Sequence, residues 1–102
     1  MNALTGVVIA GWMDYADRAA VLAACRTLTE QTRAEAGCLG YAFSADAENP
    51  DRIRVFEWWS SQEALDAHLK TQHVQDFRAV VSGIDRTGRD LHRFAVSDAQ
   101  RF

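Results

Sequence analysis

The sequence is poor in the residues and motifs that mark several large classes of protein. Among its 102 residues are two cysteines and one proline. Cys25 and Cys38 lack the CxxC and Cys/His spacings of metal sites, which favours a reduced compartment and predicts a cytoplasmic protein. No GxGxxG, GxxxxGK(S/T) or GxSxG motif is present, which argues against nicotinamide, nucleoside triphosphate and α/β-hydrolase chemistry.

An excess of basic charge and a long apolar run are also missing. The formal net charge is -3 and the sequence pI is about 5.5. Basic residues of the second half are dispersed among acids, so no basic stripe for nucleic acid is expected. The first apolar run extends from Leu4 to Trp12, contains Gly11 and is soon followed by Asp14. This run is too short for a signal or membrane helix. We therefore expect neither nucleic acid nor a membrane as a partner.

The composition that remains is that of a small globular protein. Hydrophobic residues make up 48% of the chain and charged residues 25%, as in ordinary folded domains. A chain of this length has room for one core, so residues 1–102 are predicted to form a single domain. Because a domain this small buries only about two thirds of its unfolded surface, a second copy would stabilise it, and we expect a homodimer.

Helical periods occur in two parts of the chain. Apolar residues spaced three and four apart predict a helix from about Ala16 to Glu35, capped by Asp14 and stopped by Gly37. A second helical pattern begins after Ser60 or Ser61 and is interrupted at residues 71–73.

Alternating patterns predict four strands, and the element order then predicts the fold. The first strand, a short apolar run rich in β-branched residues, is expected to be buried on both faces. The order βαββαβ predicts an α+β, ferredoxin-like domain whose antiparallel sheet carries both helices on one face. The uncovered face would pack on that of a second copy to form a dimeric α+β barrel. The predicted strands are residues 4–12, 38–45, 52–59 and 89–96.

The histidines of the second helical pattern are candidates for chemistry. His68 and His73 are five residues apart, about 140° around an ideal helix, so they do not form the i, i+4 pair of zinc helices, and no metal is expected. His68 shares a stripe with Leu65 and Leu69 and should point toward the sheet. It is either a hydrogen-bonded histidine at the edge of the core or a proton acceptor near neutral pH. His73 is interpreted as a cap or a surface residue.

A carboxylate and several aromatic side chains lie on the predicted strands and helices. Glu57 shares a strand face with Val55 and Trp59, so it must pair with a cation, an arginine above all, or have a raised pKa. The aromatic residues fit a core, a dimer interface or a cavity for a flat aromatic ligand. They include Tyr41, Phe43, Trp59 and Phe77.

Four pieces of the chain carry a resemblance to a known family. They are residues 35–41 (EAGCLGY), Asn49-Pro50, residues 57–61 (EWWSS) and residues 63–73 (EALDAHLKTQH). Together they resemble the antibiotic biosynthesis monooxygenase family, whose members are ferredoxin-like homodimers, and most of all its small quinol monooxygenase branch. The branch that oxidises anthrones has an asparagine at the position of Val55, and the haem-degrading branch has a helix tryptophan at the position of His68.

The resemblance implies an activity and a role for each candidate residue. It implies a cofactor-independent monooxygenase that oxidises a small aromatic quinol or phenol with dioxygen and needs neither metal nor flavin. The alternatives are a cofactor-free isomerase and a non-catalytic dimer that binds a small metabolite. His68 would accept the proton and Glu57 would orient the polar end of the substrate. The implied substrate-binding residues are Trp59 and Phe77 as an aromatic wall, together with His73, Tyr41 and Phe43.

Overall fold

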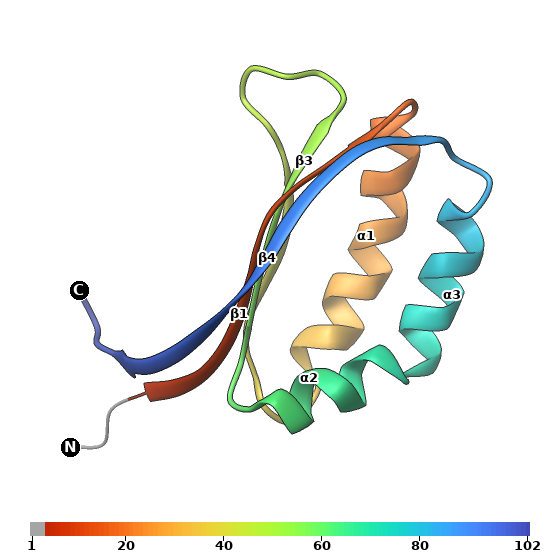
Figure 1. Cartoon of the computed structure of the whole chain (residues 1–102). Helices are drawn as coiled ribbons and strands as arrows, with labels where there is room; N and C mark the ends of the chain where they lie inside the picture. Colours follow the sequence, from red (N-terminus) through yellow and green to blue (C-terminus); the bar gives the residue numbers. More distant parts are fainter. Residues whose placement is uncertain (1–3) are drawn as a thin grey trace.

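The structure, a computed structural model, describes residues 4–102. Three helices cover one face of a four-stranded sheet, and both ends of the described chain lie away from the helices (Figure 1). The elements are β1 Leu4–Tyr15, α1 Arg18–Arg33, β2 Cys38–Ala45, β3 Arg52–Trp59, α2 Gln62–Leu69, α3 Gln72–Val81 and β4 Arg86–Ala99.

The sheet has the strand order β2-β3-β1-β4, and every neighbouring pair is antiparallel. With the second helical pattern split into α2 and α3, this is the predicted ferredoxin-like βαββαβ arrangement, so the fold prediction is confirmed. The register places Val7 opposite Trp59 and Ile9 opposite Glu57. Odd-numbered residues of β1, of β3 and, from Tyr41 on, of β2 therefore share the face that the helices cover.

The first helix begins later than predicted because a different aspartate caps it. Asp17 accepts a hydrogen bond from the Ala20 backbone N–H at 3.1 Å, and α1 runs from Arg18 to Arg33. Asp14 is instead part of β1 and accepts two hydrogen bonds from Arg52, at 2.9 and 3.0 Å. The buried residues of α1 recur at helical spacing and are Val21, Cys25, Leu28 and Thr32.

The prediction that the first strand is buried on both faces is wrong for the single chain. Val7, Met13 and Tyr15, on the helix-covered face, are 8% exposed or less. Val8 and Trp12, on the other face, are only partly buried. No helix covers that face in the described chain (Figure 1), so its apolar side chains remain partly exposed.

Gly37 lies in the turn between α1 and β2 and packs against the start of α2. Its φ of +84° lies in the left-handed region, and a Cβ atom there would come within 2.7 Å of the Ala64 side chain and 2.8 Å of the Ser60 hydroxyl. Its carbonyl accepts the Ser60 backbone N–H at 2.8 Å. A glycine is needed at this position, and the close approach sets Glu35, two residues earlier, beside the second helical segment.

The predicted interruption of the second helical pattern is confirmed, and Thr71 explains it. The Thr71 hydroxyl donates to the His68 carbonyl at 2.7 Å and accepts the Val74 backbone N–H at 3.4 Å. One side chain thus satisfies the end of α2 and caps the start of α3. Leu65 and His68 of α2 and Val74 of α3 are buried against the sheet.

The last strand is longer than predicted because it pairs along all of β1. Its pairing extends from Arg86, opposite Tyr15, to Ala99, opposite Leu4. On the face without helices, Phe94 lies opposite Val8, and Phe56 lies opposite Ala10. We call this surface the open face and define it by Val8, Ala10, Trp12, Phe56, Trp58 and Phe94. Phe56 is 43% exposed and Phe94 is 53% exposed.

Among the helices of residues 4–102, none combines the length and the apolar character that crossing a membrane requires.

Candidate active site

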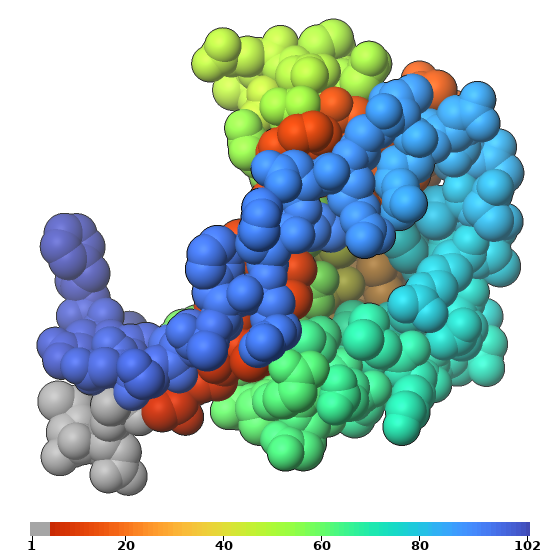
Figure 2. Space-filling model, viewed as in Figure 1, coloured from red at the N-terminus to blue at the C-terminus, as the bar shows by residue number. Residues whose placement is uncertain are grey.

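A cavity of about 220 Å³ lies between the covered face of the sheet and the helices α2 and α3. The molecular surface is hollowed between β4 and these helices (Figure 2). Strand residues that line the cavity include Tyr41, Phe43 and Glu57, and helix residues include His68 and Phe77. A larger, more open groove of about 610 Å³ lies outside α1 and β2, and neither Glu57 nor a histidine lines it. The 220 Å³ cavity is therefore the candidate site.

His68 enters this site from the inner side of α2. The residue is 2% exposed. Its ring packs on the Trp59 ring at 4.6 Å between centroids, with planes 33° apart, and meets the edge of Tyr41 at 5.4 Å. Contacts on two sides leave the imidazole little freedom to rotate, so the directions of its two nitrogens are defined.

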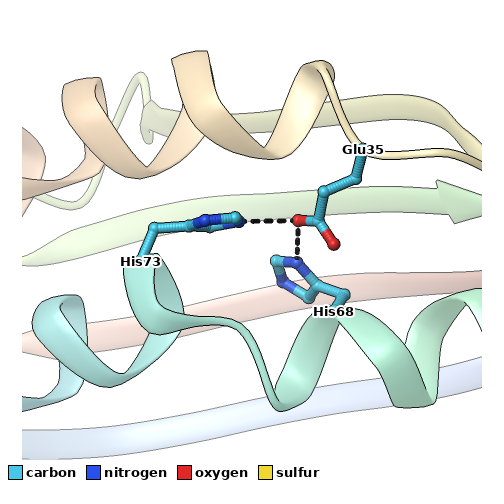
Figure 3. Close-up of side chains that lie close together, drawn as sticks. All are labelled: Glu35, His68 and His73. Carbon is cyan, nitrogen blue, oxygen red and sulfur yellow. Dashed lines mark hydrogen bonds and ion pairs between the residues drawn. The ribbon is translucent and has the colours of Figure 1, made fainter.

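The two nitrogens of His68 have different surroundings. Nε2 lies 3.5 Å from the hydroxyl of Tyr41, a residue that lines the cavity. Nδ1 lies on the other side, 2.7 Å from Oε2 of Glu35, which also lies 2.7 Å from Nε2 of His73 (Figure 3). The ring therefore separates an aromatic cavity from a polar cluster.

This polar cluster, Glu35, His68 and His73, corrects the expected relation between the two histidines. The estimate of 140° assumed one continuous helix, whereas His68 belongs to α2 and His73 to α3. The three donor atoms lie within 4.8 Å of one another, and imidazole nitrogens and carboxylate oxygens are groups that can hold a metal ion. In the structure each of the two imidazoles is hydrogen-bonded to Glu35.

Glu57 lies on the covered face and lines the cavity. Its Oε1 accepts the Trp59 indole N–H at 3.1 Å. Burial raises the pKa of this carboxyl, and the Trp59 hydrogen bond and His68 oppose the rise. Within residues 4–102 no arginine lies at ion-pair distance from Glu57, so the expected arginine pair is wrong and the alternative of a raised pKa is confirmed.

Tyr41 connects the cavity to the edge of the sheet. Burial, followed by the charge of Glu57, raises the pKa of its phenol, so the hydroxyl stays protonated and can donate to Nε2 of His68. The Tyr41 carbonyl accepts two hydrogen bonds from Arg33, at 3.0 and 2.8 Å. Because β2 is an edge strand, this arginine occupies an acceptor that the sheet leaves unpaired and holds Tyr41 in position.

Only some of the predicted substrate-binding residues line the cavity. Tyr41, Phe43 and Phe77 all line the cavity, and the last two rings lie 6.4 Å apart. Trp59 is 0% exposed and lies behind His68, outside the cavity lining. His73 lies beyond Glu35 and lines a surface hollow with residues such as Asp76 and Val80. The cavity thus contains three of the five aromatic or imidazole groups that were expected to contact a ligand.

Comparison with known proteins connects this geometry to a family. Residues 7–80 match the family described as Antibiotic biosynthesis monooxygenase. The chain belongs to this family. The match runs from within β1 to within α3 and includes the polar cluster and most of the residues that line the cavity.

Two curated relatives differ in how much of their length the chain covers. A Mycobacterium tuberculosis protein whose name proposes a monooxygenase activity is 36% identical over 75 residues, which are 72% of this chain and 73% of that protein. A Synechocystis protein of uncharacterised function is 34% identical over 56 residues, which are 55% of this chain and 38% of that protein. The chain therefore spans well under half of the Synechocystis protein.

Solved structures of family proteins have the same fold. A Chloroflexus aurantiacus protein, named as a proposed antibiotic biosynthesis monooxygenase, is 26% identical, with a TM-score of 0.77 over 93% of this chain and 96% of that one. A Deinococcus radiodurans protein with the same proposed activity has a TM-score of 0.80 at 24% identity, over 94% of this chain and 97% of that one. The second likeness shows the fold alone.

Glu35 is the member of the polar cluster that sequence reasoning did not assign to the site. It lies in the turn after α1, where the partial negative charge of the helix end disfavours a carboxylate. It also belongs to the EAGCLGY piece that carries the resemblance to the family. The sequence therefore did contain a signal for Glu35, namely an acid at an unfavourable end of a helix and within a motif of the family.

Proposed function

We propose that this chain is a cofactor-independent monooxygenase that oxidises a small aromatic quinol or phenol with dioxygen. One observation carries the proposal, namely a buried imidazole, His68, at a cavity lined by aromatic rings. A phenol in the cavity would bring its hydroxyl to Nε2, and a base at that point can take the proton. Membership of the monooxygenase family supports the same class of reaction.

The volume of the cavity favours a substrate with one ring. An apolar protein cavity of about 150 Å³ is enough to bind benzene. The cavity here has about 220 Å³, which leaves room for hydroxyl groups or a short substituent but little for a three-ring anthrone. The lining rings of Tyr41, Phe43 and Phe77 suit a flat aromatic ligand.

The proposed reaction uses the substrate as its own reductant. His68 Nε2 takes a hydroxyl proton, and the electron pair of the O–H bond stays on the phenolate oxygen. The phenolate passes electrons to dioxygen, so that one oxygen atom enters the ring and the other leaves as water. A quinol thereby loses four electrons and becomes a hydroxyquinone. Glu57, whose pKa is raised by burial, would orient the second oxygen, and its protonated form can donate a hydrogen bond to it.

A second copy of the chain and a cytoplasmic location belong to the same proposal. The open face presents large apolar side chains, Phe56 and Phe94 among them, without a covering layer. Packing against the same face of a second copy would bury them and give the homodimeric barrel expected from the sequence. Cys25 and Cys38 are free thiols, as is usual in a reducing compartment.

Oxygen uptake with a panel of one-ring quinols and phenols tests the function. We expect saturable uptake, with release of hydroxyquinone and water, by protein shown to be free of flavin and metal. His68→Asn should lower kcat by about a hundredfold or more. Glu63→Gln, on the exposed side of the same helix, is the matched control and should leave it unchanged.

Each alternative predicts a different result. Product formation without oxygen uptake would support the isomerase, and tight binding without turnover would support a binding protein. Full activity of His68→Asn with a good substrate would remove His68 from the reaction.

A further inference from the structure

The polar cluster has one unusual feature, a single carboxylate oxygen that meets two imidazoles. Oε2 of Glu35 lies 2.7 Å from Nδ1 of His68 and 2.7 Å from Nε2 of His73 (Figure 3). The side chains of Glu35, His68 and His73 are 15%, 3% and 17% exposed. The contacts are short and partly shielded from water, so both should be strong hydrogen bonds.

An acceptor at Nδ1 decides where the proton of neutral His68 resides. A carboxylate only accepts hydrogen bonds, so the ring nitrogen that faces Glu35 must be the N–H. The other nitrogen, Nε2, then has the lone pair, and it lies on the side of the Tyr41 hydroxyl and the cavity. The opposite tautomer would turn two acceptors toward each other at Glu35 and would present an N–H to the substrate.

The remaining groups around His68 agree with this tautomer. Tyr41, on β2, keeps its proton, and its hydroxyl lies 3.5 Å from Nε2, where it can act as a weak donor that an incoming substrate hydroxyl can replace. Glu57, on β3, is bonded to the Trp59 N–H rather than to the imidazole. His73, on α3, reaches His68 only through Glu35. Glu35 is therefore the ionisable side chain hydrogen-bonded to Nδ1 of His68.

His73 has a place in this arrangement that differs from ligand binding. It is outside the cavity lining and donates to the same oxygen as His68. A Glu side chain in a turn has several rotamers, and a second donor selects the one that points at His68. His73 is thus suited to hold the carboxylate rather than the substrate.

We propose that Glu35 and His73 are positioning residues that keep His68 in the Nδ1–H tautomer, with Nε2 free to accept the substrate proton. The assignment deepens the proposed function, on which its catalytic consequence rests. When Nε2 takes the hydroxyl proton, the substrate O–H bond breaks and a new N–H bond forms. The resulting imidazolium keeps its Nδ1–H bond to Glu35, whose negative charge stabilises it.

Nitrogen-15 NMR of the histidine rings tests the proposal without any substrate, because the shifts of Nδ1 and Nε2 distinguish the two neutral tautomers. At a pH where the imidazoles are neutral, we expect the wild-type His68 proton on Nδ1. Glu35→Gln offers one oxygen acceptor and adds an NH₂ donor, so it should move a large part of the population to Nε2–H. Glu35→Asp retains the carboxylate and should move less of it, and Glu63→Gln on the surface of α2 should move none.

Kinetics give the second readout. Glu35→Gln should lower kcat by about ten- to a hundredfold, with a smaller change in KM, because the substrate still binds while its proton acceptor is lost. His73→Gln should lower it by a smaller factor, and Glu35→Asp should restore part of what Glu35→Gln loses.

Three results would overturn the assignment. They are a wild-type His68 with its proton on Nε2, an unchanged tautomer in Glu35→Gln, and a stoichiometric transition metal bound to the cluster in the purified protein. If no substrate supports oxygen uptake, the proposed oxygenase function fails, and the NMR measurement still decides whether Glu35 sets the tautomer.

Discussion

The two faces of the sheet differ most clearly at two adjacent tryptophans. Trp59 is 0% exposed on the covered face, where it packs on His68 and donates to Glu57. Trp58 points to the open face opposite Val8. Successive side chains of a strand point to opposite faces. Trp59 therefore packs against the candidate site, while Trp58 belongs to the proposed surface for a second copy.

The carboxylates on the two faces also have opposite pKa shifts. On the open side, Arg52 donates two hydrogen bonds to Asp14, which lowers the pKa of that acid, and its guanidinium lies 3.6 Å from the centroid of the Trp12 ring. On the covered side, burial raises the pKa of Glu57, and an indole N–H is its hydrogen-bond donor. An acid that serves surface structure has a cation beside it, whereas the acid in the cavity has none in the described chain.

The largest effect should come from truncating the two tryptophans separately. Trp59→Ala leaves a large cavity behind His68 and should lower the free energy of unfolding by about 3–5 kcal/mol. Trp58→Ala removes a side chain that is only partly buried and should cost the monomer about 1 kcal/mol. Urea denaturation of each variant, at a concentration where the protein is monomeric, measures the difference. Equal losses would mean that the faces are not distinct in the folded monomer.

The fold could be predicted because its signals are local. The alternating pattern of β3 and the helical period of α1 each show, within a few residues, which side chains are buried. The predicted stop of the first helix at Gly37 is wrong, because α1 ends at Arg33 with Ala34 as its C-cap, and Gly37 lies in the turn before β2. The errors occurred where a local pattern has two explanations. Asp14 and Asp17 are both good caps, and the cross-strand partner Arg52, 38 residues away, decides which of them serves.

The site was predicted in part for the same reason. His68 and Glu57 could be found because each is a polar residue on an apolar face. Glu35 has no such pattern, since its role depends on a turn that folds back onto α2 and on a helix break that brings His73 to the same oxygen. Contacts between residues 33 and 38 positions apart cannot be read from periodicity.

A charge on the open face should separate the proposed dimer. Phe94 is 53% exposed, and Phe94→Glu would place two like charges in a buried apolar interface. We expect the dimer dissociation constant to rise by about a hundredfold, which corresponds to about 2.7 kcal/mol. Sedimentation equilibrium over a range of protein concentrations measures the change.

The matched control for that variant lies on the outer surface of α3. Val80 is 59% exposed, so Val80→Glu adds the same charge at a similar exposure but on the helix layer. It should leave the association unchanged. If Val80→Glu dissociates the dimer and Phe94→Glu does not, the helices rather than the open face form the interface.

The smallest effect sharpens the contrast between the two acids. Since the pKa of Glu57 is raised above its ordinary value of 4.5, the stability from its neutral form is complete below that value and is lost as the pH rises through the folded-state pKa. Glu57→Gln keeps an acceptor for the Trp59 N–H and stays neutral. It should therefore raise the free energy of unfolding by about 0.5–1 kcal/mol at pH 7, with no gain at pH 4.

Urea denaturation at the two pH values measures the effect of Glu57→Gln, with Glu48→Gln as the exposed control. A Glu57→Gln protein less stable than wild type at pH 7 would mean that the ionised carboxylate has a partner that offsets its burial, and the covered face would then resemble the open one.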